Sequence, residues 1–182
     1  EHYIGFPWKQ NSVFKFEEIH KTVIPSFLAP MDIYGNKQQI VMGSVCKCLF
    51  QHEIIKQNKI LFDTQIKFTE DLVFTLQSFS KAKKAVFINT PYYHYRKDRK
   101  NKTSTTQKYI DNLYSGLKTS QKHLYNILKD IGILELMLKH IHWRNYANIM
   151  MCVANLCLEG SVYSFRERIK ETKYYIDDSS FR

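Results

Sequence analysis

The stretch TEDLVFTLQSFSKA, residues 69–82, decides the fold of the chain around it. Its apolar residues recur at spacings of three and four, which predicts a helix with one buried face. Thr69 stands where a capping hydroxyl is expected, and two acidic residues, Glu70 and Asp71, occupy the first turn. The expected inner face consists of Leu72, Val73, Leu76 and Phe79. The acidic pair either caps the helix and complements its dipole, or is a functional carboxylate site.

Helical patterns also precede this stretch. Residues 15–29 carry apolar side chains at helical spacing, and Pro25 is expected to kink that helix or to start a second short turn. Residues 30–39 read as a polar loop. A further helix is expected between a turn at Gly43 and about residue 58. Its buried face would comprise Val45, Leu49, Ile54 and Ile55.

The period changes after residue 82. Residues 85–88 are β-prone and residues 92–96 form a second extended run. From about residue 107 the pattern is helical, with Gly132 and Gly160 as punctuation. Three helices are expected there, over about residues 107–128, 133–158 and 161–176. The fold class is therefore α/β leaning mostly α, with two or three short strands over residues 1–106 and an all-helical extension over residues 107–182.

Composition narrows the function classes. The chain of 182 residues has 27 Lys and Arg against 17 Asp and Glu, a net charge of +10. This balance favours anionic partners such as nucleic acid, lipid head groups or phosphorylated small molecules, or serves only solubility. The four cysteines lack zinc-ribbon spacing and read as free thiols of a reducing cytosol. The longest apolar run is too short to span a bilayer, and the N-terminus, which is not Met, lacks a signal pattern, so a cytoplasmic fragment is expected.

Four motifs follow one another in a specific order and spacing. They are Lys47-x-Leu49-Phe50, Phe62-Asp63, Glu70-Asp71-Leu72-x-Phe74 and Val86-Phe87-Ile88-Asn89-x-Pro91-x-Tyr93-x-Tyr95-Arg96. This run, over about residues 40–106, resembles the C-terminal half of bacterial family-2 glycosyltransferases with the GT-A fold, which build capsule, cell-wall and lipooligosaccharide chains. The resemblance implies an incomplete GT-A fold. Cys48 departs from the family pattern by separating Lys47 from Leu49, which puts the alignment of Lys47 in doubt.

The resemblance implies transfer of a sugar from a nucleotide-sugar to a glycan or lipid-linked acceptor, with inversion at the anomeric carbon. It makes the acidic pair the source of the general base, with Asp71 as first choice and Glu70 as second. The chemistry agrees, because an inverting displacement needs one carboxylate to take the proton of the acceptor hydroxyl. Backbone N–H groups and the positive end of a helix keep a first-turn carboxylate ionised.

The same resemblance assigns further site residues. Those expected to bind the phosphates of the leaving nucleotide are Arg96, His94 and Arg99, of which Arg96 suits bidentate pairing. Those expected at the acceptor are Gly43, Ser44 and Lys47, although the glycine and serine also suit a plain turn. A solvated charge run and a half-buried strand histidine remain the alternatives for the first set. Trp8 and Trp143 suit sugar stacking but are more often core residues.

The donor half of the family is not recognisable. No Asp-x-Asp motif occurs in the chain, so a metal ligand set is not assigned and no cofactor is expected in this chain. Mn²⁺ or Mg²⁺ is expected for the full-length enzyme, where it would bridge the diphosphate. We therefore expect this chain to hold the acceptor side and the base, and to be inactive alone.

The helical extension has two readings. Its apolar stripe of Ile110, Leu113, Leu117, Leu124 and Leu128 either docks on a protein or on the inner face of the bacterial membrane, or packs internally, which is the favoured reading. Two rival functions from other classes stay open. One is a basic helical module that binds nucleic acid. No nucleic-acid-binding motif occurs in the sequence, and we do not expect nucleic acid to be a partner. The other is a helical protein-interaction domain without catalysis.

Overall fold

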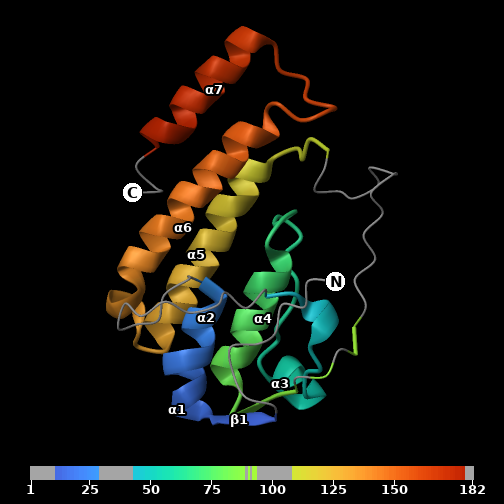
Figure 1. The fold of residues 1–182 in the computed structure, drawn as a ribbon, viewed down its shortest axis with the longest axis vertical. Coiled ribbons are helices and arrows are strands. Elements are labelled where there is room, and N and C mark those ends of the chain that lie inside the picture. The colour runs from blue at the N-terminus through green and yellow to red at the C-terminus, as the bar shows by residue number, and fades with distance from the viewer. Residues whose placement is uncertain (1–10, 29–42, 89, 91, 94–107, 179–182) are drawn as a thin grey trace.

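The computed structural model describes residues 11–28, 43–88, 90, 92–93 and 108–178. These residues form a mostly helical fold with one small antiparallel sheet, as the sequence predicts (Figure 1). The elements, in chain order, are β1 Ser12–Lys15, α1 Phe16–Glu18, the π-helical turn η1 Ile19–Val23, α2 Ile24–Leu28, the 3-10 turn η2 Val45–Lys47, α3 His52–Gln57, α4 Glu70–Lys81, β2 Lys84–Phe87, α5 Leu113–Asp130, α6 Leu134–Asn155 and α7 Phe165–Asp177.

The N-terminal helix is continuous from α1 through η1 to α2, which confirms the helix expected at residues 15–29. Pro25 is the second residue of α2 and is buried. A proline removes one backbone donor and crowds the carbonyl of the preceding turn. Directly before it lies the wider π turn, in which the N–H of Ile24 reaches the carbonyl of Ile19. This wider turn gives the proline ring and the crowded carbonyl room without breaking the helix.

The sheet pairs the two ends of the N-terminal part. β1 runs antiparallel to β2, with Ser12 opposite Phe87 and Lys15 opposite Lys84. The strand expected at residues 85–88 is confirmed to within one residue, and its partner among the described residues is the segment before the first helix. Tyr92 and Tyr93 lie in no strand, and residues 94–96 are outside the described residues.

The helix expected from Gly43 to about residue 58 is wrong in its middle. η2 ends at Lys47, Cys48 is extended with φ −117° and ψ 144°, and α3 begins only at His52. Because extended backbone alternates its side chains, Leu49 points outward and is fully exposed, against the expectation of a buried position. Phe50 on the inward side packs edge-on against Phe74 of α4 instead.

α4 is the centre of the fold, as its pattern predicts. Leu72, Val73 and Leu76 are buried and Phe79 is partly buried against the same core. The core cluster joins α4 to side chains of α2, α5 and α6, so it draws on both sides of the predicted division at residues 106 and 107. That division into two parts stays a prediction.

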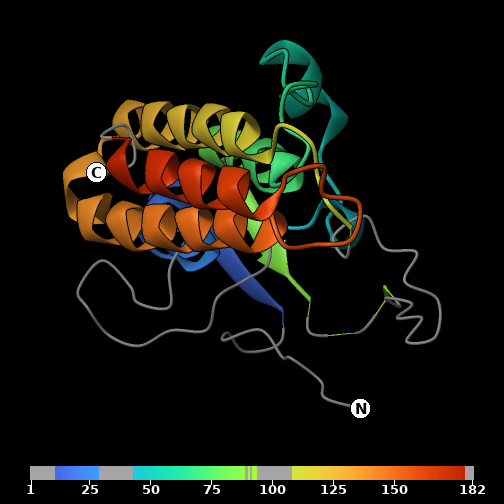
Figure 2. The same cartoon turned by 90° about the horizontal axis from the view of Figure 1, so that it is seen from above.

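The three C-terminal helices match the predicted pattern, with shifted starts. α5 and α6 lie side by side and α7 packs back on them (Figure 2). Gly132 and Gly160, at φ +74° and +91°, occupy left-handed positions between them, where glycine is favoured. Four members of the predicted stripe are buried on α5, which confirms internal packing: Leu113, Leu117, Leu124 and Leu128. The fifth, Ile110, lies before α5 and is partly buried against the same helices. Trp143 is about half exposed, so it is not a core residue, and Trp8 lies outside the described residues.

None of the described helices combines the length and the apolar composition that a membrane crossing requires.

Candidate functional site

The acidic pair opens α4. Thr69 occupies the N-cap position in the left-handed conformation, with φ +74°, and its side chain does not cap the helix. Its hydroxyl instead donates a hydrogen bond of 2.8 Å to Ser120 Oγ on α5. The expectation of a threonine cap is therefore wrong. Glu70 and Asp71 are half-buried in the first turn, where the unpaired N–H groups of the helix favour negative charge.

Asp71 faces the start of η2. Its Oδ2 atom lies 3.4 Å from Ser44 Oγ and 3.4 Å from the backbone nitrogen of Val45, and both groups donate to it. These bonds are long compared with the usual 2.7–3.2 Å for N–H donors. They orient the carboxylate but leave it capacity to accept a further proton or hydrogen bond. The structure thus brings together two predicted site residues that stand 27 positions apart, Asp71 and Ser44.

Gly43 allows this approach. A Cβ at this position would lie 2.6 Å from Leu72 Cδ1 and 3.1 Å from Leu72 Cα. The second atom is backbone, so a side chain would push the segment away from α4. Gly43 therefore makes its close contact with the residue that follows Asp71. The contact with Leu72 is thus a third explanation for a glycine at position 43, besides approach of the acceptor and formation of a turn.

Lys47 and Cys48 complete the local surroundings. Lys47 ends η2, and desolvation lowers the pKa of its ammonium. Burial raises the pKa of the Cys48 thiol; the positive charge of Lys47 opposes this rise, and the negative charge of Asp71 adds to it. The thiol donates to the carbonyl of Ser44 at 3.5 Å. Cys48 therefore stays a neutral thiol beside the acidic pair.

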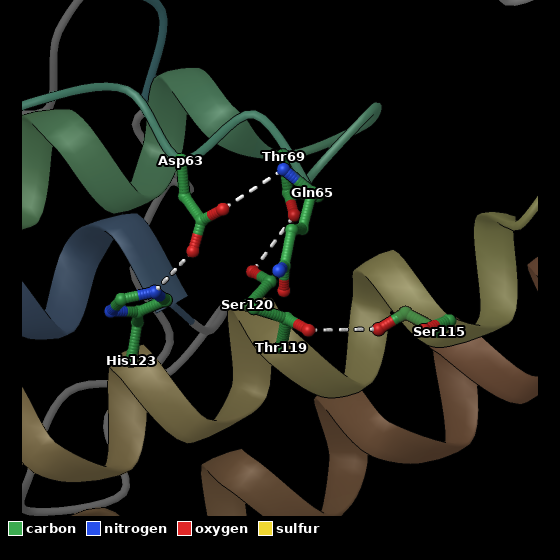
Figure 3. A network of polar contacts seen from close by, with 7 residues as sticks. All are labelled: Asp63, Gln65, Thr69, Ser115, Thr119, Ser120 and His123. Carbon is green, nitrogen blue, oxygen red and sulfur yellow. Dashed lines mark hydrogen bonds and ion pairs between the residues drawn. The ribbon is translucent and has the colours of Figure 1, made fainter.

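The segment before α4 is held by α5 (Figure 3). His123 Nε2 lies 2.9 Å from Asp63 Oδ2, and the other oxygen of Asp63 accepts the backbone N–H of Gln65 at 2.9 Å. Sequence reasoning missed these residues as part of the site. Asp63 belonged to the Phe-Asp motif without a role, and no local pattern connects it to a histidine 60 positions later.

The predicted phosphate-binding residues lie outside the described residues: His94, Arg96 and Arg99. Within the described part of the chain, no three His, Cys, Asp or Glu side chains gather where they could hold a metal ion. The described residues thus do not supply a metal site, and we derive no chemical step through a metal.

Two grooves on the described surface lie away from the acidic pair. One, of about 350 Å³, runs along α7 beside Ile169 and Ile176. The other, of about 610 Å³, lies between α5 and Tyr174 and is lined by Lys118 and Tyr125 among others. Neither includes Asp71, so the acidic pair is identified by its contacts and its position on α4.

One known protein is similar to this chain over a limited stretch. The poly(ribitol-phosphate) beta-glucosyltransferase of Bacillus spizizenii is 37% identical over 65 residues, which is 36% of this chain and 10% of that protein. The match therefore spans about a tenth of the relative. No family model and no solved structure matches the chain. The similarity indicates a glycosyltransferase relationship at this coarse level.

Proposed function

We propose that this chain carries the general base and the acceptor side of an inverting glycosyltransferase. The single observation that carries the proposal is the contact of Asp71 Oδ2 with Ser44 Oγ and the Val45 N–H, each at 3.4 Å. A plain helix cap would bond to backbone N–H groups of its own helix. Asp71 is directed instead at a segment of predicted acceptor residues, and the glycosyltransferase similarity supports this reading.

The proposed reaction moves a sugar from a nucleotide-sugar to a hydroxyl of a glycan or lipid-linked acceptor. The acceptor oxygen attacks the anomeric carbon from the face opposite the diphosphate, and the bond from that carbon to the diphosphate oxygen breaks. Its electron pair leaves with the nucleotide. Asp71 takes the proton of the attacking hydroxyl as the new bond forms.

Asp71 is preferred over Glu70 for this role. The described contacts connect Asp71, and not its neighbour, to the segment at Ser44 and Val45. We propose that the acceptor lies along Gly43, Ser44 and Lys47. The Ser44 hydroxyl would hydrogen-bond an acceptor hydroxyl, and the Lys47 ammonium would attract an anionic acceptor.

The donor side of the proposal extends beyond the described residues. His94, Arg96 and Arg99 would bind the leaving diphosphate. A GT-A fold of family 2, a donor half elsewhere in the intact protein and a Mn²⁺ or Mg²⁺ ion there belong to the same proposal. The relative is named for glucosyl transfer to poly(ribitol-phosphate), and the net charge of +10 suits an acceptor of similarly anionic character. Transfer of sugar to such an envelope polymer would take place at the inner face of the membrane.

The test is the Asp71→Asn variant of the intact protein, compared with Glu70→Gln. Asparagine keeps the shape and can still accept from Ser44, but it cannot take a proton. We expect turnover to fall by about 10²–10⁴ with donor affinity unchanged. Glu53→Gln on α3, an exposed carboxylate, is the matched control and should leave turnover unchanged. Full turnover in Asp71→Asn, with loss in Glu70→Gln, would move the base to Glu70. Full turnover in both would overturn the proposal.

A further inference from the structure

Three residues on one face of α5 contact the segment that leads into the acidic pair. Gly116, Ser120 and His123 follow one another at spacings of four and three, so they lie on the same side of the helix. Each contacts a different part of residues 63–69. This face of α5 is therefore the support on which the start of α4 rests.

Gly116 allows backbone to approach backbone. A Cβ there would lie 3.2 Å from the carbonyl oxygen of Gln65 and 3.5 Å from the nitrogen of Lys67. Neither atom is the end of a flexible side chain. The segment is therefore seated directly on the backbone of α5, and even one methyl group would displace it by a few tenths of an ångström.

Ser120 holds the last residue before the acidic pair. Its side chain is only 2% exposed, and its oxygen accepts the Thr69 hydroxyl at 2.8 Å. Thr69 is a β-branched residue in the left-handed region, a conformation that costs free energy and needs support from its surroundings. The hydrogen bond supplies such support at the residue from which α4 starts.

His123 holds the other end of the segment. Its Nε2 pairs with one oxygen of Asp63, while the second oxygen closes a turn on the N–H of Gln65. Both oxygens of this carboxylate are thus used, one within the segment and one toward α5. The segment is fixed at Asp63, at Gln65 and at Thr69, immediately before Glu70 and Asp71 (Figure 3).

We infer that Gly116, Ser120 and His123 are positioning residues for the proposed base: they set the place and direction of Asp71 through residues 63–69. This inference rests on the proposed function for its catalytic meaning. Displacement of a catalytic group by about 1 Å costs about a hundredfold in rate, so contacts that fix the residues directly before Asp71 matter for turnover. The helical extension is then part of the catalytic unit and not a separate docking module.

The experiment uses Ser120→Ala and His123→Ala in the intact protein. Thr119→Ala is the matched control for the first, because the Thr119 hydroxyl bonds Ser115 of its own helix. His142→Ala, an exposed histidine on α6, is the control for the second. We expect kcat to fall by about tenfold in both test variants with KM for the donor unchanged. Hydrogen exchange of residues 64–71 should quicken in the same two variants, and neither control should change.

His123→Gln provides the rescue. A glutamine amide nitrogen reaches about the place of Nε2, so it can keep the bond to Asp63 and should restore most of the rate. If Ser120→Ala unfolds the protein, His123→Ala and its rescue carry the test.

The two proposals fail differently. If Asp71→Asn abolishes turnover while Ser120→Ala and His123→Ala match their controls in kcat and exchange, the base stands and the positioning role is overturned. If Asp71→Asn retains turnover, the catalytic role of all three residues is overturned with it. Faster exchange of residues 64–71 would then identify the contacts as purely structural.

Discussion

The hydroxyl of Thr69 donates a hydrogen bond of 2.8 Å to Ser120 Oγ, across 51 positions of sequence. Thr69 is the residue before the acidic pair, and Ser120 is the eighth residue of α5, which packs against α4. A threonine at a helix start normally bonds to the N–H groups of its own helix. Here it does not cap its own helix and instead joins α4 to the helical extension.

Gly43→Ala is expected to destabilise the fold and to slow the proposed transfer. The new Cβ would stand 2.6 Å from Leu72 Cδ1 and 3.1 Å from Leu72 Cα. Relief of this overpacking costs about 1–3 kcal/mol and moves Ser44 away from Asp71. Urea denaturation and kcat measure the two effects.

Leu72→Ala tests the cause of that loss. It removes Cδ1, the nearest of the clashing atoms, so the double variant should lose less stability than the two single losses added together. Strict additivity in this cycle would show that Gly43 is not constrained by Leu72.

Leu76→Ala and Leu49→Ala should differ strongly. Leu76 is 1% exposed in the core, and its truncation is expected to cost about 2–5 kcal/mol through lost contacts and a cavity. Leu49 is fully exposed, so the same change there should alter the free energy of unfolding by less than about 0.5 kcal/mol. Chemical denaturation of both variants measures the contrast. Equal losses would mean that residues 48–51 are helical and buried after all.

Leu49 shows where prediction from the sequence stops. α4 and the helices after residue 113 follow from apolar spacing and glycine positions, because each is long enough for a pattern to repeat. β1 has four residues and pairs with a strand about seventy positions away, so local pattern cannot reveal it. The same limit applies to Leu49. It is exposed because its backbone is extended, and the packing of Phe50 on Phe74 stabilises that extended stretch.

The candidate site divides in the same way. Glu70 and Asp71 stand out in the sequence because charge directly precedes an apolar helix. The sequence also predicts Ser44, the partner of Asp71, as a site residue, because the resemblance assigns both residues to the site. The supports at Ser120 and His123 come from a helix whose sequence shows only its buried stripe. Their contacts depend on tertiary packing, for which a single sequence has no signal.

Alkaline pH is expected to loosen α7. Burial, aided by Tyr163, raises the pKa of Tyr109 to about 12, and burial also raises the pKa of Tyr114 and Tyr175 well above the usual value near 10. A raised pKa means that the neutral tyrosine stabilises the fold. This stabilisation is complete below about pH 10 and is lost as the pH rises toward the folded values. Absorbance at 295 nm and near-ultraviolet circular dichroism should change together above pH 10.

Tyr114→Phe isolates one part of that effect. The Tyr114 hydroxyl donates to Asp178 Oδ2 at 2.6 Å, next to the Lys118 ammonium at 2.9 Å from the same oxygen. Without the hydroxyl, the stability of the variant should depend less on pH above 10. An unchanged alkaline transition would show that Tyr114 does not contribute to it.

Acid is expected to release the segment before the proposed base. The hydrogen bond from His123 and then that from the Gln65 N–H lower the pKa of Asp63 below its usual value near 4. A lowered pKa means that the ionised carboxylate stabilises the fold. This stabilisation is complete above about pH 4 and is lost as the pH falls through the folded pKa. Asp63→Asn should therefore show a smaller loss of stability between pH 5 and pH 3 in urea denaturation.

At neutral pH the same variant should cost roughly 0.5–1 kcal/mol, because the pair with His123 is partly exposed and an asparagine oxygen can still accept from Gln65. Asp111→Asn is the control. The ion pair of Asp111 with Lys67 is 3.8 Å long and both side chains are exposed, so this variant should measurably change neither the free energy of unfolding nor its pH dependence. If Asp63→Asn behaves like Asp111→Asn, the contact with His123 does not stabilise the segment. Only Gly116 and Ser120 would then remain as positioning residues for Asp71.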